Sequence, residues 1–161
     1  MLYSSRDPQR AIDACERGLE TAQRIGDLGL QSRLSANLAV AYCTLTNRCD
    51  ERGLTAAHEA IRIDRSTGQL DHLAVSLVVL AQIYHCHGQP ARALRHYSEA
   101  LELAEKSGEP QLLFPCYDGL ATLYLDTDDG ELAQRYMARA RDTCDRAGLD
   151  PDALIVLPYL A

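Results

Sequence analysis

The sequence of 161 residues contains no tryptophan, a single phenylalanine and a single lysine. Its net charge is −7, so it lacks the basic surface with which proteins contact nucleic-acid phosphates, and the same acidic excess disfavours anionic membranes. No apolar run approaches the roughly 20 residues that a membrane-spanning helix needs. Residues 1–10 contain no apolar segment typical of a signal peptide. We therefore expect a cytoplasmic protein that binds neither nucleic acid nor membrane.

Motifs that hold cofactors are also missing. The sequence has no GxxxxGKS/T or GxGxxG phosphate-binding loop and no CxxC pair. The cysteines are scattered singly along a chain whose helical pattern already supplies a core, which favours reduced thiols that act as small apolar side chains. They are Cys15, Cys43, Cys49, Cys86, Cys116 and Cys144. We expect no disulfide framework, no bound metal and no cofactor.

What the sequence does contain is a repeat of about 40 residues. The glycines Gly26, Gly68, Gly108 and Gly148 stand in similar surroundings and are 42, 40 and 40 residues apart. Each follows a segment rich in Ala, Leu, Glu and Arg. Glycine just past a helix end is the usual stop, because it enters the left-handed region without steric cost. The glycines therefore indicate helix ends at a regular period.

Each repeat contains two helices with matching landmarks. The pattern Leu-Ala-x-x-Tyr occurs in the first helix, at residues 38–42, 80–84 and 120–124, and an Ala-rich pattern marks the second helix. Apolar residues at i, i+3, i+4 and i+7 predict amphipathic helices, and no segment shows the sustained alternation of a strand. The expected helices cover residues 8–25, 28–46, 50–67, 70–87, 90–107, 111–127 and 130–147, with a last one from about 151.

These patterns resemble those of tetratricopeptide repeats over nearly the whole chain, and best in LVVLAQIYHCHGQPARALRHYSEAL, residues 77–101. The resemblance implies an all-α fold, a right-handed α-solenoid of antiparallel helix pairs in one domain over residues 1–161. The family norm is about 34 residues per unit. Longer units are similar to those of bacterial regulators that join an ATPase or a nucleotide cyclase to a helical-repeat tail. The units here are a partial repeat at 1–27, full repeats at 28–69, 70–109 and 110–149, and a partial repeat at 150–161.

The repeat register places both ends of the chain inside a unit. Leu2-Tyr3 aligns with the end of a first helix, and Leu160-Ala161 aligns with the middle of one. We therefore expect a fragment of a longer array, whose exposed repeat ends favour a homodimer. The alternative is a small protein with atypical capping ends, which solenoids require.

The stretch YHCHGQP, residues 84–90, gathers two histidines and a cysteine. His85 and Cys86 diverge by about 100° on a helix, so they cannot both reach one metal ion. A zinc site needs three or four ligands, and the nearest further candidates are Cys43 and Asp126. A Cys–His nucleophile would need an orienting group and an oxyanion site, which nothing in the sequence supplies. The register instead predicts the end of one helix and the turn to the next.

In tetratricopeptide folds the first helices line a concave surface that binds partners. Carried over by register, this surface has an apolar middle and an acidic flank, which suits a peptide segment with apolar anchors and a basic residue. The valines suit packing between helices equally well. The residues expected on this surface are Arg33, Asn37, Val40, Cys43, Val78, Gln82, His85, Asp118, Thr122 and Asp126.

The resemblance also disfavours one kind of partner. Members of the family that bind acidic chaperone tails hold the C-terminal carboxylate with Lys, Asn and Arg. The matching positions here are Ala36, Val40, Gln82, Asp118 and Thr122, and none is basic. Gln82 and Thr122 could still form hydrogen bonds with a peptide backbone.

We predict a non-catalytic scaffold that binds a protein or peptide, as the helical-repeat region of a larger bacterial regulator. Two alternatives stay open. The chain could be a sensor tail that binds a small ligand and biases an attached ATPase or cyclase, or a structural array whose ends self-associate. An enzyme is the least favoured interpretation, because the sequence offers no nucleophile with its supporting groups.

Overall fold

A computed structural model describes residues 7–46 and 51–149 of the chain. These residues form seven α-helices and no strand, which confirms the all-α fold of antiparallel helix pairs. Each helix expected within the described residues agrees with an observed one to within one residue at either end, and the helix expected from about 151 lies outside them. The helices are α1 (Pro8–Ile25), α2 (Leu28–Thr46), α3 (Glu51–Thr67), α4 (Leu70–Cys86), α5 (Pro90–Ser107), α6 (Pro110–Asp126) and α7 (Gly130–Ala147).

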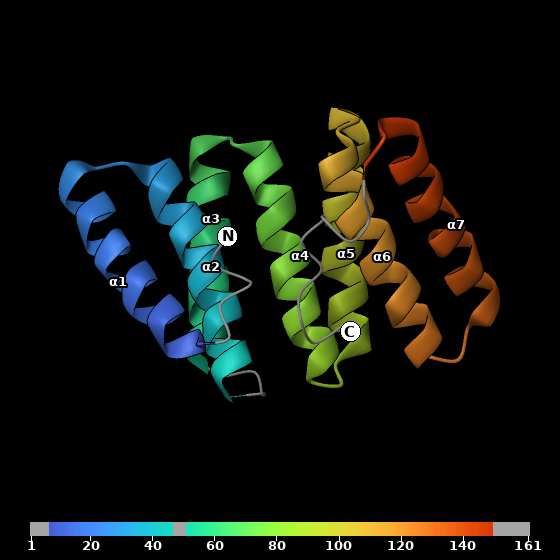
Figure 1. Cartoon of the computed structure of the whole chain (residues 1–161), viewed down its shortest axis with the longest axis horizontal. Coiled ribbons are helices and arrows are strands. Elements are labelled where there is room, and N and C mark those ends of the chain that lie inside the picture. The colour runs from blue at the N-terminus through green and yellow to red at the C-terminus, as the bar shows by residue number, and fades with distance from the viewer. Residues whose placement is uncertain (1–6, 47–50, 150–161) are drawn as a thin grey trace.

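The helices are arranged in two layers (Figure 1). Helix pairs α2–α3, α4–α5 and α6–α7 make the most extensive contacts, and α2, α4 and α6 also contact one another along the array. In Figure 1 this α2–α4–α6 layer lies in front of α3 and α5. We call its outer surface the α2–α4–α6 face. Because these helices are alternate members of the array, they run parallel to one another.

Residues in the left-handed conformation end the helices, as the repeat predicts. The four glycines that mark the period have φ between 61° and 73°. One turn uses another residue: Asp128, with φ 64°, stands where Gly88, with φ 67°, stands 40 residues earlier. Aspartate enters this region more readily than most residues do. Asp129 then caps α7, since its carboxylate accepts the N–H of Leu132 at 3.1 Å.

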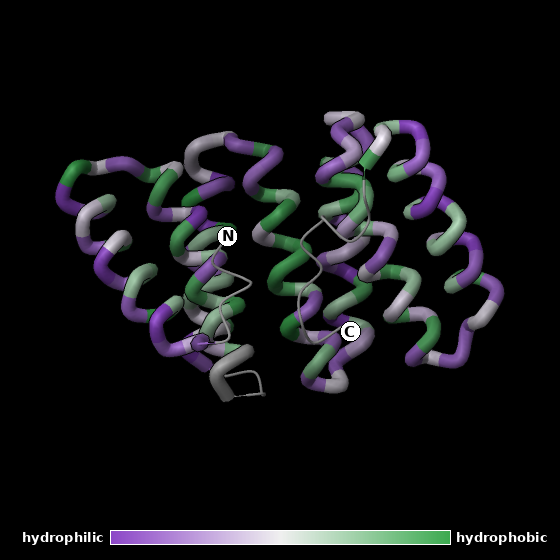
Figure 2. Tube along the Cα trace, viewed as in Figure 1, coloured by the Kyte–Doolittle hydropathy of each residue, from purple (hydrophilic) through white to green (hydrophobic). Residues whose placement is uncertain are grey.

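The core is richest in α4, which contacts helices on both sides. Eleven of its 17 residues are buried, against five of the 18 in its partner α5. Figure 2 shows hydrophobic residues along most of α4, whereas hydrophilic ones dominate α1 and α7. Alanines such as Ala57, Ala81 and Ala93, all 0% exposed, let neighbouring helices approach closely. No helix within the described residues is long and apolar enough to cross a membrane.

Helices α5 and α6 pack closely at the point where a tyrosine meets a glycine. Tyr97 of α5 is 0% exposed, and its ring lies over Gly119 of α6. A Cβ atom at residue 119 would lie 2.6 Å from Cζ and 2.9 Å from the hydroxyl oxygen of Tyr97, which is closer than atoms can approach. Gly119 therefore creates the space for the ring, and the tyrosine hydroxyl reaches the α6 backbone beside Asp118.

Candidate functional site

Four of the ten residues expected to contact a partner are buried. Val40, Cys43, Val78 and Gln82 are 2%, 8%, 7% and 4% exposed. The two valines and the cysteine belong to the hydrophobic core cluster. Their packing role is therefore clear, while a contact of these residues with a partner stays a prediction.

Five of the six other expected residues lie on α2 or α6, and the structure leaves these polar residues accessible to different degrees. Arg33 and Asp126 are exposed, whereas Asn37, Asp118 and Thr122 are half-buried. The α2–α4–α6 face therefore offers mainly polar groups to a partner.

His85 and Asp126, expected as separate contacts, bind each other. The distance from His85 Nε2 to Asp126 Oδ2 is 2.7 Å, so the last turns of α4 and α6 are joined by a hydrogen bond. The His85 side chain is 8% exposed and that of Asp126 is 65% exposed. This pair also shows the register of the two helices: the turn before His85 on α4 faces the turn before Asp126 on α6.

Cys86 lies beside this pair but is poorly suited to chemistry. Its thiol pKa is raised to about 11, chiefly by burial and further by Cys43 and Asp126. The thiolate is the form that attacks substrates and binds metals, so this environment disfavours both roles. Within the described residues, no group of three or more His, Cys, Asp or Glu side chains is placed to hold a metal ion.

Asp118 is a half-buried acid on the face. It lies two turns before Asp126 on α6, and its carboxylate makes no hydrogen bond or ion pair with any residue that the structure describes. The nearby hydroxyl of Thr122 donates to the backbone carbonyl of Asp118, at 3.0 Å. Burial without a partner raises the pKa of the Asp118 carboxyl.

The buried polar atoms without a partner among the described residues include the hydroxyl of Tyr97 on α5, and Oε1 of Gln82 and Nδ1 of His85 on α4. Burial raises the pKa of Tyr97 well above its usual range, and Asp118 is among the charges that raise it further, so the two groups are close. Gln82 lies one turn before His85 on α4, which places it across from Thr122. Unpaired polar groups therefore gather where α4 meets α6.

Sequence reasoning missed the most deeply buried acid. Asp64 of α3 is 0% exposed, and its carboxylate accepts hydroxyl hydrogen bonds from Ser32 of α2 at 2.5 Å and Ser76 of α4 at 2.7 Å. It stands four residues before a turn glycine. The repeat alignment could have revealed it, because the corresponding residues of the other units are Ala22, Ala104 and Cys144. An acid at a small-residue position is a signal for a buried polar contact.

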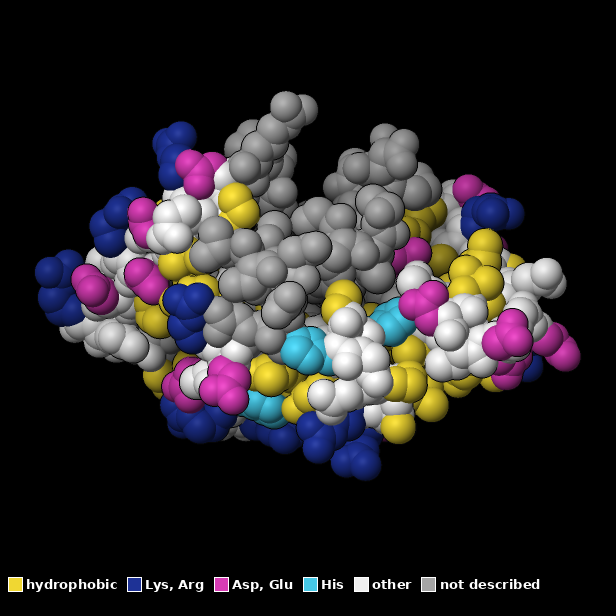
Figure 3. Space-filling model, turned by 90° about the horizontal axis from the view of Figure 1, so that it is seen from below, with side chains coloured by type: hydrophobic (Ala, Val, Ile, Leu, Met, Phe, Trp, Pro, Cys, Tyr) yellow, Lys and Arg dark blue, Asp and Glu magenta, His cyan; other side chains and the backbone are white. Residues whose placement is uncertain are grey.

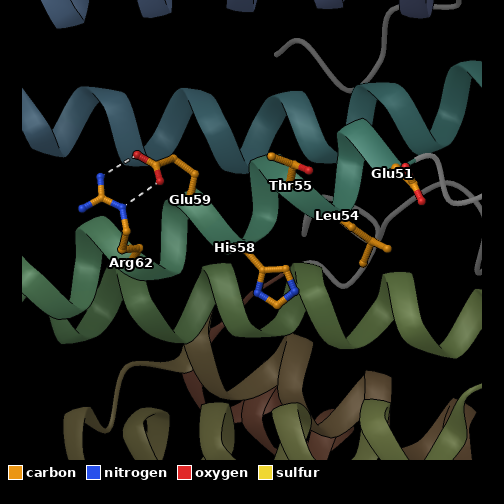
Figure 4. A pocket seen from close by; sticks show the side chains of 6 residues that line it. All are labelled: Glu51, Leu54, Thr55, His58, Glu59 and Arg62. Carbon is orange, nitrogen blue, oxygen red and sulfur yellow. Dashed lines mark hydrogen bonds and ion pairs between the residues drawn. The ribbon is translucent and has the colours of Figure 1, made fainter.

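A hollow of about 660 Å³ lies along the flank of α3, and it is a weaker candidate. Its lining residues all come from that one helix, so it is a shallow surface rather than an enclosed cavity. Arg62 pairs with Glu59 through two hydrogen bonds of 2.8 and 2.6 Å, and His58 points away from that pair (Figure 4). The lining residues are Glu51, Leu54, Thr55, His58, Glu59 and Arg62.

The contacts around Tyr84 tie α3 and α5 to α4. Its hydroxyl lies 3.4 Å from Nε2 of His58, its ring stacks on His96 at 5.5 Å, and the Arg92 guanidinium lies 5.4 Å from the ring centre. Figure 3 shows histidine side chains among hydrophobic ones in the middle of this end of the molecule, with Lys and Arg side chains along the lower edge. These contacts stabilise the packing of the three helices, while Nδ1 of His96, a buried atom, has no hydrogen-bond partner among the described residues.

Comparison with known proteins supports the fold and leaves the function open. No family model matches the sequence, and no curated protein matches it. Among solved structures, BtubC (BKLC) from P. vanneervenii is similar, with a TM-score of 0.74 and 20% sequence identity. The match covers 89% of this chain but only 59% of that one. A likeness at this identity concerns the fold alone.

Proposed function

We propose that this chain is a tetratricopeptide-like, non-catalytic scaffold that binds a protein or peptide segment across the α2–α4–α6 face. The observation that carries the proposal is Asp118, a half-buried carboxylate on that face with no partner among the described residues. Polar groups left unpaired in a fold cost free energy, and such costs are expected at functional sites. A binding partner would supply the missing contacts.

The place of this scaffold in a larger protein is part of the same proposal. The long repeat unit supports a role as the helical-repeat region of a cytoplasmic bacterial regulator. The 660 Å³ hollow on α3 and the Tyr84 contacts favour no catalytic alternative, since Arg62 is paired with Glu59 and His58 contacts the Tyr84 hydroxyl. Self-association through the repeat ends stays a prediction, which light scattering at increasing protein concentration would test.

The experiment is a selection of peptide binders followed by two matched substitutions. Randomised 12-residue peptides displayed on phage are selected against the immobilised protein. Val75, on α4, and Met137, on α7, are exposed apolar residues at 46% and 40% exposure. We expect Val75→Arg to abolish binding of the selected peptides, because it places a bulky charge on the face, and Met137→Arg to leave binding unchanged. The proposal would be contradicted if the selected peptides bound the Val75→Arg variant as tightly as they bind the original protein.

A further inference from the structure

We propose that the α4–α6 part of this face binds a lysine or arginine side chain of the partner, with Asp118 as its counter-ion and Gln82 and Thr122 as flanking hydrogen-bonding groups. This inference rests on the proposed function and specifies the chemistry of its partner. It rests on three independent features of the region, which are its unpaired acceptors, the absence of a local cation and an adjacent apolar strip.

The acceptors come from three helices. Asp118 and Thr122 lie one turn apart on α6, Gln82 faces them from α4, and the Tyr97 hydroxyl arrives from α5 through the space that Gly119 leaves. Gln82 is 4% exposed and Tyr97 is 0% exposed, yet Gln82 Oε1 and the Tyr97 hydroxyl have no partner among the described residues. Ammonium and guanidinium groups carry three to five N–H donors and no acceptor, so they match a cluster of this kind.

The described part of the chain offers no cation of its own to Asp118. The neighbouring acid Asp126 is already bound by His85 at 2.7 Å, and Asp64 is satisfied by two hydroxyls. Of these three acids, Asp118 is the one without a partner among the described residues. The net charge of −7 also favours the approach of a basic segment over an acidic one.

The apolar strip beside the acceptors is the surface of Val75, which is 46% exposed on α4. Val75 lies one turn before the buried Val78, and Val78 lies one turn before Gln82. Lysine and arginine bury their methylene stems along apolar surface while the charged end stays hydrogen-bonded. The spacing of two helical turns, about 10 Å, admits such a side chain lying along the helix.

The first test uses a small cation as the probe, so that it does not depend on any peptide. Nα-acetyl-lysine methylamide is titrated into the protein, and the backbone amide of Gly119 and the side-chain amide of Gln82 are followed by NMR. The uncharged norleucine analogue is the control. We expect shifts with the lysine compound that are absent with the norleucine compound and absent in Asp118→Asn. Equal shifts with both compounds, or an unchanged response in Asp118→Asn, would overturn the inference.

The second test uses the selected peptides. We expect lysine or arginine at a fixed position in them, and a loss of affinity of about tenfold when that residue becomes methionine or when Asp118 becomes Asn. Asp145→Asn, at an exposed acid on α7, changes the net charge equally and should leave affinity unchanged. Peptides that are sensitive to Val75→Arg but carry no basic preference would leave the proposed function standing and remove this inference. A lysine-specific shift at Gly119 without any selected peptide would show a site for the small cation but contradict the proposed function, and with it the inference that the cation belongs to a partner.

Protein stability separates binding from a structural role. If Asp118 serves a partner, Asp118→Asn should weaken binding while the melting temperature stays the same or rises, because an unpaired, partly desolvated charge is removed. A variant that loses both affinity and thermal stability would show that Asp118 holds the fold together, and would overturn the inference.

Discussion

Asp64 and Asp118 are both shielded from water, but only Asp64 has hydrogen-bond donors for its carboxylate among the described residues. Asp64 is 0% exposed and accepts hydroxyls from Ser32 on α2 and Ser76 on α4. Asp118 is half-buried, and its carboxylate has no partner among the described residues. The first acid therefore joins three helices, because its hydrogen bonds replace the water it has lost. The second stabilises nothing that the structure describes.

The difference separates a structural acid from a binding acid. A buried carboxylate is tolerated when its oxygens are hydrogen-bonded, even by neutral donors. A carboxylate without such donors raises the free energy of the folded chain and gains most from a ligand that carries them. The substitutions below are ordered by the size of the effect that we expect from them.

The largest effect is expected at Asp64. Asp64→Ala removes the acceptor of two buried hydroxyl hydrogen bonds. Ser76 loses its partner and Ser32 keeps only a contact of 3.4 Å with the carbonyl oxygen of Ala60, which should cost roughly 3 kcal/mol of unfolding free energy. Urea denaturation followed by circular dichroism measures it. Asp64→Asn keeps one oxygen acceptor and should cost less. An Asp64→Ala protein that unfolds at the original urea midpoint would mean that this contact does not hold the three helices.

Gly119→Ala should have the second largest effect, a loss of about 1–3 kcal/mol of unfolding free energy, because the new methyl group overlaps the buried ring of Tyr97. It should also displace the Tyr97 hydroxyl from the neighbourhood of Asp118. Gly130→Ala is the matched control, since a Cβ there meets no atom within 4 Å. Equal melting temperatures of the two variants would contradict the packing described for α5 and α6.

Asp118→Asn should stabilise the folded protein, whereas the two substitutions above destabilise it. Burial raises the pKa of Asp118 in the folded chain above 3.8, so the folded state binds its proton more tightly than the unfolded state does. Stability is therefore lost as pH rises from 3.8 through the folded pKa, and the variant escapes this loss. We expect its melting temperature to exceed that of the original protein by about 1–3 °C at pH 7, and the difference to vanish as pH falls through that window. A difference that does not depend on pH would show another cause.

The smallest effect is expected for Asp126→Asn. Asp126 forms a hydrogen bond with His85, but its side chain is 65% exposed. Water can therefore replace most of the interaction that the substitution removes. We expect a change in unfolding free energy of about 0.5 kcal/mol or less. Thermal unfolding at pH 7 measures it, and a loss as large as that of Asp64→Ala would remove the contrast between exposed and buried acids.

Much of the fold could be predicted from the sequence. The turn glycines and the Leu-Ala-x-x-Tyr pattern located every helix in the described residues to within one residue, because helix ends and amphipathic periodicity are local properties. The same register placed Cys43, Cys86 and Asp126 near one another in neighbouring units, and Cys43 and Asp126 are among the groups that raise the pKa of the Cys86 thiol.

The candidate site was predicted only in part. His85 and Asp126 were expected on one surface, but their mutual hydrogen bond was not. Asp64 was not recognised as a buried contact, since its partners lie 32 and 12 residues away in the sequence. Gln82 was expected to be available to a peptide, and its 4% exposure depends on how α4 is enclosed.

The sequence by itself determined the helices, their ends and their order in the array, because hydrogen bonds within a helix and left-handed glycines involve only near neighbours. The tertiary structure decided which of the two carboxylates receives hydrogen bonds from the described residues. Asp64 and Asp118 are chemically identical, and both stand on amphipathic helices. Only the packing of α2, α3 and α4 brings two serine hydroxyls to Asp64, whereas the packing of α4, α5 and α6 leaves Asp118 without a donor.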